Sequence, residues 1–547
     1  MTKEGSGNKN YVRFMLVTLG LFLVALILYL CGITGANHPE GFLGVVTFIL
    51  AFMPILSVLI GMLGFNLSAM KVAPFAFVLA VAYSLTYFRL YDTTAGSVMG
   101  AGQAISLLWT NTYKGIISSL FIVGLIFFSF LILEMMKQSG AMDIVKDKIA
   151  SVSADRRYQL ILIGLFVPIF MEGAAGAGTP AAIAAPFMVG LGFDPIIAVV
   201  VALMSDGVCT SFGGSGLTTM SGGAALVTSG VSTEALNFSL AGWFHMVGIL
   251  VMPFLILLTA FGKKGFKGKG IVGYALYCGI IGGLLMFVFS NYIGGFVTDM
   301  GTGFVGIILA IVGLKIFKIE TPEEFKYKFS KNDSDEKPKF GFVRALSPYI
   351  LILILFPVVL TGSKYIHVTT GDKVITLWAY ICSKVTYNGW IDILLFIVSL
   401  VAIATLKYGF KNYCKSFVTS LKKVIAVLII MASLLAVSNI MKLSYSPDGS
   451  SMITRLAVDI ASVASPVYPV AAVLIGSIGA FITGTNLGSN ILFAELHTTA
   501  AVTLGINPIV QFAAGNAGGS LGNMICPNNV TAACATVNLI GQESKVM

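Results

Sequence analysis

Charged residues are scarce along the whole chain. Only 11% of the residues are Asp, Glu, Lys or Arg, whereas a typical soluble domain has roughly 25%. Hydrophobic residues make up 57% of the sequence and the mean hydropathy is +0.92. Apolar stretches of about 20 residues, long enough to cross a bilayer as a helix, recur along nearly the whole chain. This composition excludes a soluble globular protein and predicts an all-α polytopic membrane protein.

Cysteine is also sparse, and its spacing carries no signal. The chain has no Cys-x-x-Cys pair and no combination of Cys and His at the spacing of a zinc site. We therefore expect no disulfide framework, no bound metal and no other cofactor. The seven cysteines are Cys31, Cys209, Cys278, Cys382, Cys414, Cys526 and Cys534.

Long polar segments are missing too, and the basic residues gather in short loops. The net charge of +10 comes mainly from four groups, at residues 137–157, 263–269, 315–344 and 407–423. Placing all four in the cytoplasm satisfies the positive-inside rule and puts the N-terminus there as well. The loops then left outside, such as 229–240 and 292–300, contain no Lys or Arg, whereas 362–388 carries three lysines and departs from the rule. The positive charge thus predicts orientation in a lipid bilayer and not nucleic-acid binding.

One apolar stretch contains a carboxylate followed by glycines and prolines. Residues 171–195 read "MEGAAGAGTPAAIAAPFMVGLGFDP", with Glu172 near the start. The predicted topology requires an odd number of crossings between residues 157 and 229. We therefore expect a hairpin that enters over 158–170, turns in the glycine-rich stretch and returns over 181–192, followed by a crossing helix interrupted at 205–216. Irregular backbone at membrane depth is tolerated only where it is buried in protein or lines a cavity.

The second half of the chain repeats this layout. "LGFDP" at 191–195 is echoed by "LGINP" at 504–508, and polar, glycine-bearing breaks at 482–490 and 515–529 match those of the first half. The topology makes the two repeats antiparallel. Inverted repeats with broken helices at matching positions are typical of secondary transporters whose site lies near the membrane midplane. The alternative is that the glycines only let helices pack closely.

The expected architecture has about 12 spanning helices and two re-entrant hairpins. Five segments follow from it: scaffold helices at 1–136, a first repeat core with a hairpin and a broken helix at 137–262, and scaffold helices with a cytoplasmic loop at 263–346. They continue with second-half scaffold helices at 347–423 and a second repeat core at 424–547. A monomer and a homodimer are both compatible with the sequence.

Four blocks of sequence resemble the L-lactate permease family of bacterial proton-coupled lactate and glycolate carriers. They read "EGAAGAGTPAAIAAPFMVGLGF", "SFGGSG", "GAFITGTNLGSNILF" and "GGSLGNMICPNNVTAACATVNLIGQESKV". The resemblance runs in order from about residue 109 to the C-terminus. It implies transport of 2-hydroxymonocarboxylates (L-lactate, D-lactate, glycolate) with protons across the bacterial inner membrane, by an elevator-type movement of a hairpin-bearing domain. The chain departs from the family at Ala177, Asp206 and the pair Glu495 and His497.

The breaks contain no Lys or Arg, so a bound carboxylate needs other partners. Helix N-termini offer positive potential, glycine permits close approach, and hydroxyl and amide groups donate hydrogen bonds. For the asparagines after residue 515, helix capping is an equally good interpretation. The predicted substrate-binding residues are Gly176, Gly178, Thr179, Ser211, Thr483, Thr485, Asn486, Ser489, Asn490, Asn516 and Asn523.

Few protonatable residues lie in the apolar segments. Glu172 and Asp206 belong to the two first-half breaks, where a buried carboxyl group can accept a proton. His497 is a weaker candidate, because a lone His is more often a satisfied core residue than a proton carrier. Glu495, two positions before it, faces a different direction on a helix. We therefore expect proton coupling at Glu172, Asp206 or His497. His245, next to Trp243, is expected to anchor a helix near the outer interface.

Three alternatives remain. A sodium-coupled carboxylate or dicarboxylate carrier is the nearest one, because unwound carbonyls can hold Na⁺. A membrane-embedded acyltransferase is suggested only by "HVTTGD" at 367–372, which has an HxxxxD spacing without a second catalytic cluster. A channel would need rings of like charge or a repeated filter, and the two breaks differ.

Overall fold

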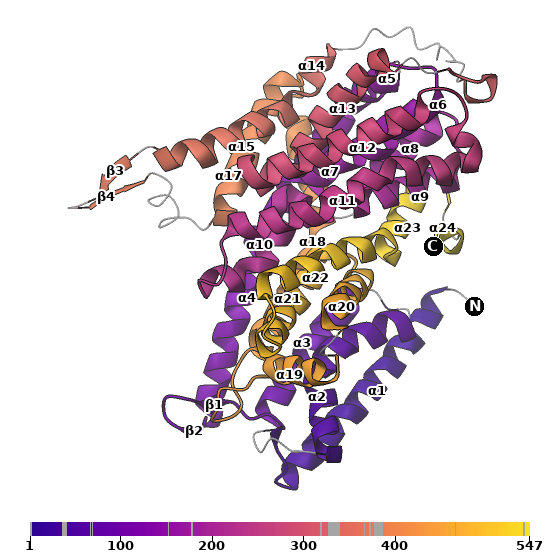
Figure 1. Ribbon diagram of the computed structural model, residues 1–547. Coiled ribbons are helices and arrows are strands. Elements are labelled where there is room, and N and C mark those ends of the chain that lie inside the picture. The colour runs from indigo at the N-terminus through magenta and orange to yellow at the C-terminus, as the bar shows by residue number, and fades with distance from the viewer. Residues whose placement is uncertain are drawn as a thin grey trace. The chain divides into compact units, whose positions relative to one another are not determined.

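The computed structural model is almost entirely helical (Figure 1). It describes residues 3–35, 41–65, 67, 69–150, 152–176, 179–317, 320–326, 340–365, 367–370, 373–376, 387–464, 467–539 and 542–547. The chain forms two compact units, each assembled from separate segments. Unit 1 comprises Met1–Val123, Ser221–Val231 and Ile425–Gly519, and unit 2 comprises Gly124–Met220, Ser232–Val424 and Ser520–Met547.

Unit 1 contains the N-terminal helices and most of the second repeat. Its complete elements are α1 (Lys3–Leu30), α2 (Gly41–Leu59), η2 (Ile60–Gly64), α3 (Ala69–Leu85), β1 (Tyr91–Asp92), β2 (Ser97–Val98), α19 (Met452–Ala464), α20 (Tyr468–Thr483) and α21 (Asn486–Thr503). Here α19 packs on α2 and α21, and α20 packs on α21. Four helices continue from one unit into the other: α4 (Ala101–Gln138), α10 (Gly213–Thr228), α18 (Phe410–Met441) and α22 (Pro508–Met524).

Unit 2 contains the first repeat and the helices that follow it. Its first elements are α5 (Ala141–Ala150), α6 (Arg156–Ile161), η3 (Leu162–Phe166), α7 (Val167–Ala175), α8 (Thr179–Gly190), α9 (Pro195–Gly207), η4 (Thr210–Phe212), α11 (Glu234–Phe261), η5 (Gly262–Phe266) and α12 (Ile271–Val288). The others are η6 (Phe289–Ile293), η7 (Gly295–Val297), α13 (Thr298–Ile316), η8 (Glu323–Phe325), α14 (Phe342–Ala345), α15 (Ser347–Tyr365), β3 (His367–Thr370), β4 (Lys373–Thr376), α17 (Tyr387–Thr405), α23 (Pro527–Thr536) and α24 (Glu543–Val546). The strands form two short antiparallel pairs, β1 with β2 and β3 with β4.

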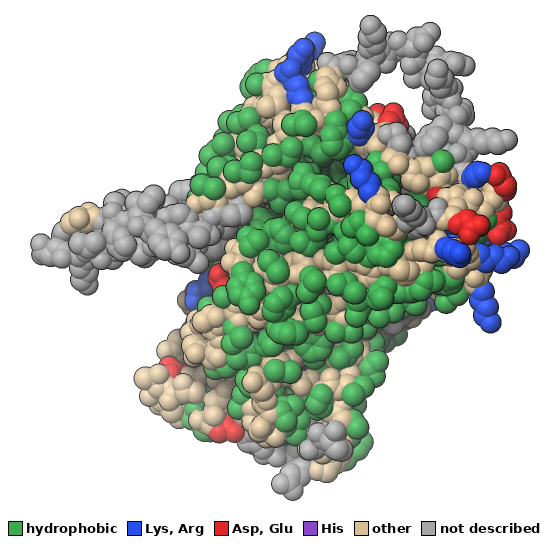
Figure 2. Space-filling view, turned by 45° about the horizontal axis from the view of Figure 1, so that its top comes forward, with side chains coloured by type: hydrophobic (Ala, Val, Ile, Leu, Met, Phe, Trp, Pro, Cys, Tyr) green, Lys and Arg blue, Asp and Glu red, His purple; other side chains and the backbone are tan. Residues whose placement is uncertain are grey.

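The helices have the lengths and exposed apolar surface of a membrane protein. Among the described residues, 7 helices are long and apolar enough to cross a bilayer, or up to 8 if one bent pair is a single span. Four further apolar helices, in α3, α8, α17 and α20, are shorter. Apolar side chains cover most of the face seen in Figure 2. The prediction of an all-α polytopic membrane protein is therefore confirmed, while the number of about 12 spans stays a prediction.

The segment that carries Glu172 is enclosed by protein. All residues in the most apolar window of Arg156–Ala174 are buried, compared with 17% for Asn10–Leu30. The entering arm of the expected hairpin is also longer than 158–170, because α6, η3 and α7 follow one another without a gap from Arg156 to Ala175. The chain then turns at Gly176 and returns through α8. Arg156 donates a hydrogen bond to the Gly192 carbonyl, so both ends of this helical hairpin meet.

The sequence echo corresponds to a repeated order of elements. In the first repeat α7, α8 and α9 follow one another, and in the second α20, α21 and α22 do so. Asp194 accepts hydrogen bonds from the backbone N–H groups of the second and third residues after it, and Asn507 does the same. Each is followed by a proline at the first helical position, where a missing N–H is harmless. Gly192 and Gly505 precede these caps with φ of 80° and 66°, which only glycine adopts without strain.

Three of the basic loops lie together at one end of unit 2. The Arg157 guanidinium forms an ion pair with Asp155 at 2.8 Å and donates to the carbonyls of Lys267 and Glu320 at 2.5 and 3.2 Å. Lys423 pairs with Glu134 at 2.7 Å, which connects the fourth basic group to the segment before residue 137. At the other ends of these helices, Ser239 donates to Asn291 at 2.5 Å. The loops that were predicted to share a side of the membrane thus lie together within unit 2.

Candidate functional site

The first broken helix lies between α9 and α10. Asp194 and Pro195 start α9, which ends at Gly207, and the chain changes direction by 61° before the stretch Thr210–Thr228. Gly214, Ser215 and Gly216 all have positive φ, of 55°, 55° and 77°. A serine in the left-handed region is strained, and such strain persists only where surrounding contacts hold it. The interruption predicted at 205–216 is therefore present, although its first residues are still helical.

The second broken helix is interrupted over a much shorter stretch than predicted. Residues 515–524 belong to the regular helix α22, and only Ile525 and Cys526 separate it from α23. In the same way, the break predicted at 482–490 is confined to Gly484 and Thr485. The prediction of irregular backbone throughout these stretches was wrong. A side chain at Gly518 would collide with the Val473 backbone, so close helix packing accounts for this glycine.

The two broken helices contact each other in unit 2. Thr210 donates to the Ser520 hydroxyl at 2.8 Å, and Ser211 lies 3.1 Å from the same oxygen. Asn523 donates its amide to an Asp206 carboxylate oxygen at 3.3 Å. A Cβ atom at Gly207 would overlap the Met524 side chain, so the backbones approach closely. The last turn of α22 therefore meets the end of α9, and it brings together three predicted residues, Asp206, Ser211 and Asn523.

Three buried carboxyl groups lie beside this crossing. Glu172, Asp206 and Asp299 are 3%, 0% and 1% exposed. The side chains of Glu172 and Asp206 are close enough to interact electrostatically, and Asp299 interacts with Asp206 and with the Cys209 thiol. One oxygen of Glu172 rests against Gly213, the first residue of α10, where a side chain would displace it. Within the described residues, none of these carboxyl groups forms an ion pair with Lys or Arg.

Asp299 was not among the sequence candidates. It stands in the first turn of α13, at the end of the segment 292–300 that was expected to be an outer loop. The sequence signal that could have drawn attention to it is that Asp299 is the single acid in "FVTDMGTGF", a stretch without basic residues. Where the structure describes the chain, no group of three or more His, Cys, Asp and Glu side chains has the arrangement of a metal site.

A second polar cluster lies in unit 1, around Asn516 on α22. Asn486 and Asn490 donate their amides to the Asn516 side chain at 3.1 and 2.8 Å, and Asn486 also donates to the Asn516 carbonyl at 3.0 Å. A Cβ atom at Gly519 would overlap the Asn486 side chain. Asn516 stands in the interior of α22 and is no helix cap, whereas Asn523 stands in the last turn of the helix. The structure thus brings together three of the predicted substrate-binding residues, Asn486, Asn490 and Asn516.

The hydroxyl groups of this cluster bond to backbone. Thr485 caps α21 by accepting from the Gly488 N–H at 2.9 Å, and Ser489 donates to the Gly476 carbonyl at 2.8 Å. Thr483 donates to the carbonyls of Gly479 and Thr485 at 2.9 Å each. These bonds hold the turn between α20 and α21, while the hydroxyl oxygens keep acceptor capacity.

Some predicted residues lie at the edge of what the structure describes. Gly176 ends α7 with φ of 62° and lies against Gly214, next to the first break. Gly178 is outside the described residues, and so is the side chain of Thr179, the first residue of α8. In "HVTTGD", Asp372 and the side chain of His367 fall outside as well, and the described backbone there forms the hairpin of β3 and β4.

The histidines occupy aromatic surroundings. His497 is 2% exposed, and its Nδ1 lies 3.3 Å from the Tyr468 hydroxyl. Glu495 instead pairs with Lys442 at 3.0 Å, so these two residues do face different directions. The expectation for His245 was wrong: it is 4% exposed, packs on the Phe212 ring and hydrogen-bonds the Val208 backbone at the first break. The position of His245 two residues after Trp243 could not reveal this contact, because the contact depends on how α11 packs on α9.

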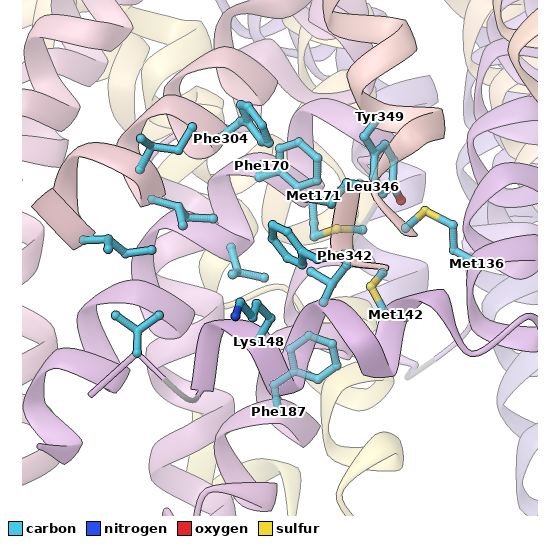
Figure 3. A pocket seen from close by; sticks show the side chains of 16 residues that line it. Met136, Met142, Lys148, Phe170, Met171, Phe187, Phe304, Phe342, Leu346 and Tyr349 are labelled. Atoms are coloured by element: carbon cyan, nitrogen blue, oxygen red, sulfur yellow. The ribbon is translucent and has the colours of Figure 1, made fainter. Parts of the chain in front are cut away.

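A separate cavity of about 320 Å³ in unit 2 is apolar. Figure 3 shows Phe170, Met171 and Phe342 around it, and Lys148 at its edge. It is lined by Met136, Met142, Val145, Lys148, Val152, Val167, Phe170, Met171, Phe187, Phe304, Ile307, Ile308, Ile311, Phe342, Leu346 and Tyr349. A small polar anion left without hydrogen bonds in such a cavity would be strongly disfavoured, so the helix crossing is the better candidate site.

Together these features define a multi-pass helical membrane protein with two broken helices that cross beside buried carboxyl groups. The chain belongs to the L-lactate permease family, whose model matches residues 47–388 and 382–547. It is similar to the L-lactate permease of Bacillus subtilis (strain 168), with 24% identity over 537 residues that cover 88% of this chain and 92% of the relative. The glycolate permease GlcA of Escherichia coli (strain K12) is 24% identical over 548 residues, 93% of each chain. The L-lactate permease of Streptococcus iniae is 28% identical over 477 residues, covering 84% of this chain and 92% of the relative.

Proposed function

We propose that this protein is a secondary transporter that carries small 2-hydroxymonocarboxylates, such as lactate and glycolate, together with protons. The observation that carries the proposal is the contact between the two broken helices beside Glu172 and Asp206. The relatives, L-lactate permeases and a glycolate permease, suggest the substrate class. The chain is accordingly a carrier and not an enzyme.

The crossing can bind an anion without a basic side chain. The right-handed part of α10 begins after Gly216 and α23 begins at Pro527, each directly after a break, and a helix N-terminus carries partial positive charge. Thr210, Ser211 and Ser520 present hydroxyl groups that can rearrange around a carboxylate or a substrate hydroxyl. Such a site lacks a full countercharge, so it releases its ligand as readily as transport requires.

The buried carboxyl groups supply the coupling. A negatively charged Glu172 next to an incoming anion repels it, whereas a protonated Glu172 donates a hydrogen bond. Protonation and anion binding therefore favour each other, and by thermodynamic linkage the effect is reciprocal. Asp206 contributes to the same equilibrium because its buried carboxyl group interacts electrostatically with that of Glu172.

The architecture we propose has about 12 spans, with two re-entrant hairpins formed by α7 with α8 and by α20 with α21. The two repeats are inverted, and one part of the protein moves against the other as in an elevator. The gathering of basic loops around Arg157 supports a common cytoplasmic side for those loops. From the charge rule alone we place the N-terminus on the same side, and the protein in the bacterial inner membrane.

The experiment is uptake into liposomes that contain the purified full chain. An inward proton gradient should drive accumulation of L-lactate and glycolate, and a protonophore should abolish it. Pyruvate and succinate test the substrate class, and replacing Na⁺ by K⁺ tests the sodium alternative. Equal accumulation with and without the proton gradient would refute proton coupling. Accumulation that requires Na⁺ would establish the sodium-coupled carrier instead.

A further inference from the structure

Asp299 is a buried acid outside both repeats, and it faces the crossing of the broken helices. Its side chain is 1% exposed, and neither carboxylate oxygen receives an N–H or O–H donor from the described residues. The Cys209 thiol, a weak donor, is its neighbour. A Cβ atom at Gly173 would lie 2.7 Å from the Asp299 Cβ, so Asp299 rests directly on the backbone next to Glu172.

Close helix packing holds Asp299 in this place. A side chain at Gly173 would lie 2.6 Å from the Met300 backbone nitrogen, and one at Gly303 would overlap the Phe170 backbone. A side chain at Gly306 would overlap the Phe166 ring. Because α7 and α13 touch backbone to backbone over these turns, they behave as one packed pair. Asp299 is therefore a fixed neighbour of Glu172.

Two hydroxyl groups near the acids give a second, independent observation. Thr302 and Ser205 are both 0% exposed, and neither hydroxyl has a hydrogen-bond partner among the described residues. Thr302 stands one turn after Asp299 and so on the same face of α13, and Ser205 precedes Asp206. Buried hydroxyl groups usually have partners. Because these two hydroxyl groups have no partner among the described residues, they are available to a proton carrier or a ligand at this place.

The groups that face Asp299 are all acidic or weakly polar. Asp206 and Cys209 interact with it, and Glu172 lies across the contact with α7. The helix α12, which also packs on α13, has no charged residue, and its Tyr274 and Tyr277 bond to carbonyls of Ala310 and Leu309 near the other end. Three adjacent carboxyl groups without a countercharge cannot all be ionised in a buried site.

We propose that Asp299 is a third proton-exchanging residue of the coupling site, which shares protons with Glu172 and Asp206 during transport. This inference rests on the proposed proton coupling. When the anionic substrate arrives, the charge of the three carboxyl groups has to fall, so the site takes up protons from solution. Asp299 is a further group in the site that can donate this proton and accept it back.

The test is the number of protons taken up when L-lactate binds to the purified full chain. Calorimetry in buffers of different ionisation enthalpy, at one pH, measures that number. Asp299→Asn should take up at most about half as many protons as the wild type and should lose about tenfold in gradient-driven accumulation, while lactate exchange stays within about threefold. The matched control is Asp143→Asn, an exposed acid of α5, which should behave as the wild type.

The outcomes separate this inference from the proposed function. A wild type without proton uptake and without a response to the proton gradient refutes proton coupling itself. Suppose that the wild type takes up protons on binding and responds to the proton gradient. If Asp299→Asn then takes up as many protons as the wild type, only the role of Asp299 is refuted. If the Asn variant does not stay folded, Asp299→Glu decides: proton exchange predicts that Glu retains wild-type proton uptake, whereas a purely structural role predicts that both variants lose folded protein.

Discussion

The amide of Asn523 donates a hydrogen bond of 3.3 Å to the carboxyl group of Asp206, across 317 residues of sequence. The bond joins the last turn of the second repeat's broken helix to that of the first. It gives a buried carboxyl group a neutral donor in place of a cation. Because no basic side chain forms an ion pair with Asp206 among the described residues, we expect this contact to affect how much negative charge the crossing tolerates.

The effect of a substitution at Asn523 on substrate exchange should depend on whether the new side chain can donate a hydrogen bond, and not on its size. Asn523→Ala removes one hydrogen bond to an acid, which contributes about 1.5–3 kcal/mol, so substrate exchange should fall roughly 10- to 100-fold. Asn523→Asp, nearly identical in shape, places another carboxyl group beside Asp206 and should lower exchange further. Exchange rates in liposomes at equal protein density measure both. An Asp variant more active than the Ala variant would contradict this account of the contact.

Gly213 should not accept a side chain, because a Cβ atom there would overlap the Glu172 carboxyl group. Gly213→Ala should therefore displace Glu172 and reduce gradient-driven uptake at least about tenfold, since misplacing a group by about 1 Å has effects of this size or larger. The control is Gly190→Ala in α8, where nothing lies within 4 Å of the added atom. Uptake by the control should stay near the wild type. Equal behaviour of the two variants would show that space beside Glu172 does not matter.

Arg157 should be essential for stability and not for transport chemistry. It is fully buried, pairs with Asp155 and donates to carbonyls in two other loops. Arg157→Ala removes the countercharge of the buried Asp155 carboxylate, which keeps only the backbone N–H of residue 157 as a donor, and should lower the unfolding free energy by about 3–5 kcal/mol. Arg455→Ala breaks a half-buried pair with Asp459 and should cost only about 0–1 kcal/mol. Thermal unfolding in detergent compares them, and similar losses would refute the special role of Arg157.

The asparagine cluster of unit 1 remains a predicted substrate contact. Alanine at Thr179, Asn486, Ser489 and Asn490 together should raise the lactate concentration for half-maximal exchange by about tenfold or more, as expected when hydrogen bonds to a charged ligand are lost. Thr503→Ala, an exposed position at the end of α21, is the control. If the well-folded fourfold variant keeps the wild-type value, Thr179 does not contact the substrate, and Asn486, Ser489 and Asn490 only hold α20, α21 and α22 together.

Local sequence was sufficient to predict the matching helix starts at residues 194–195 and 507–508, and it singled out two of the three buried acids. The echo of Asp194-Pro195 and Asn507-Pro508 has a local cause, since each pair caps and starts a helix. Glu172 and Asp206 stood out because each is an acid in an apolar segment. Asp299 was missed because its contact with the site depends on how α13 packs on Gly173, which no local pattern encodes.

The extent of the breaks was overestimated for a related reason. Glycine can end a helix, as Gly484 does with φ of 81°, or let two helices touch, as Gly518 does beside Val473. Both uses produce the same residue in the sequence, so composition cannot separate them. Burial and backbone conformation do, and they assign most glycines of 515–524 to packing within a regular helix.

The central claim is that Glu172 couples protonation to anion binding. Glu172→Gln imitates the protonated acid, so the variant should bind lactate and exchange it across the membrane at close to the wild-type rate. It should nevertheless lose accumulation driven by a proton gradient. Both modes are measured on the same purified variant in the same liposomes. Retention of exchange with loss of gradient-driven uptake is the predicted result; full gradient-driven uptake by the variant, or a parallel loss of both modes, would contradict it.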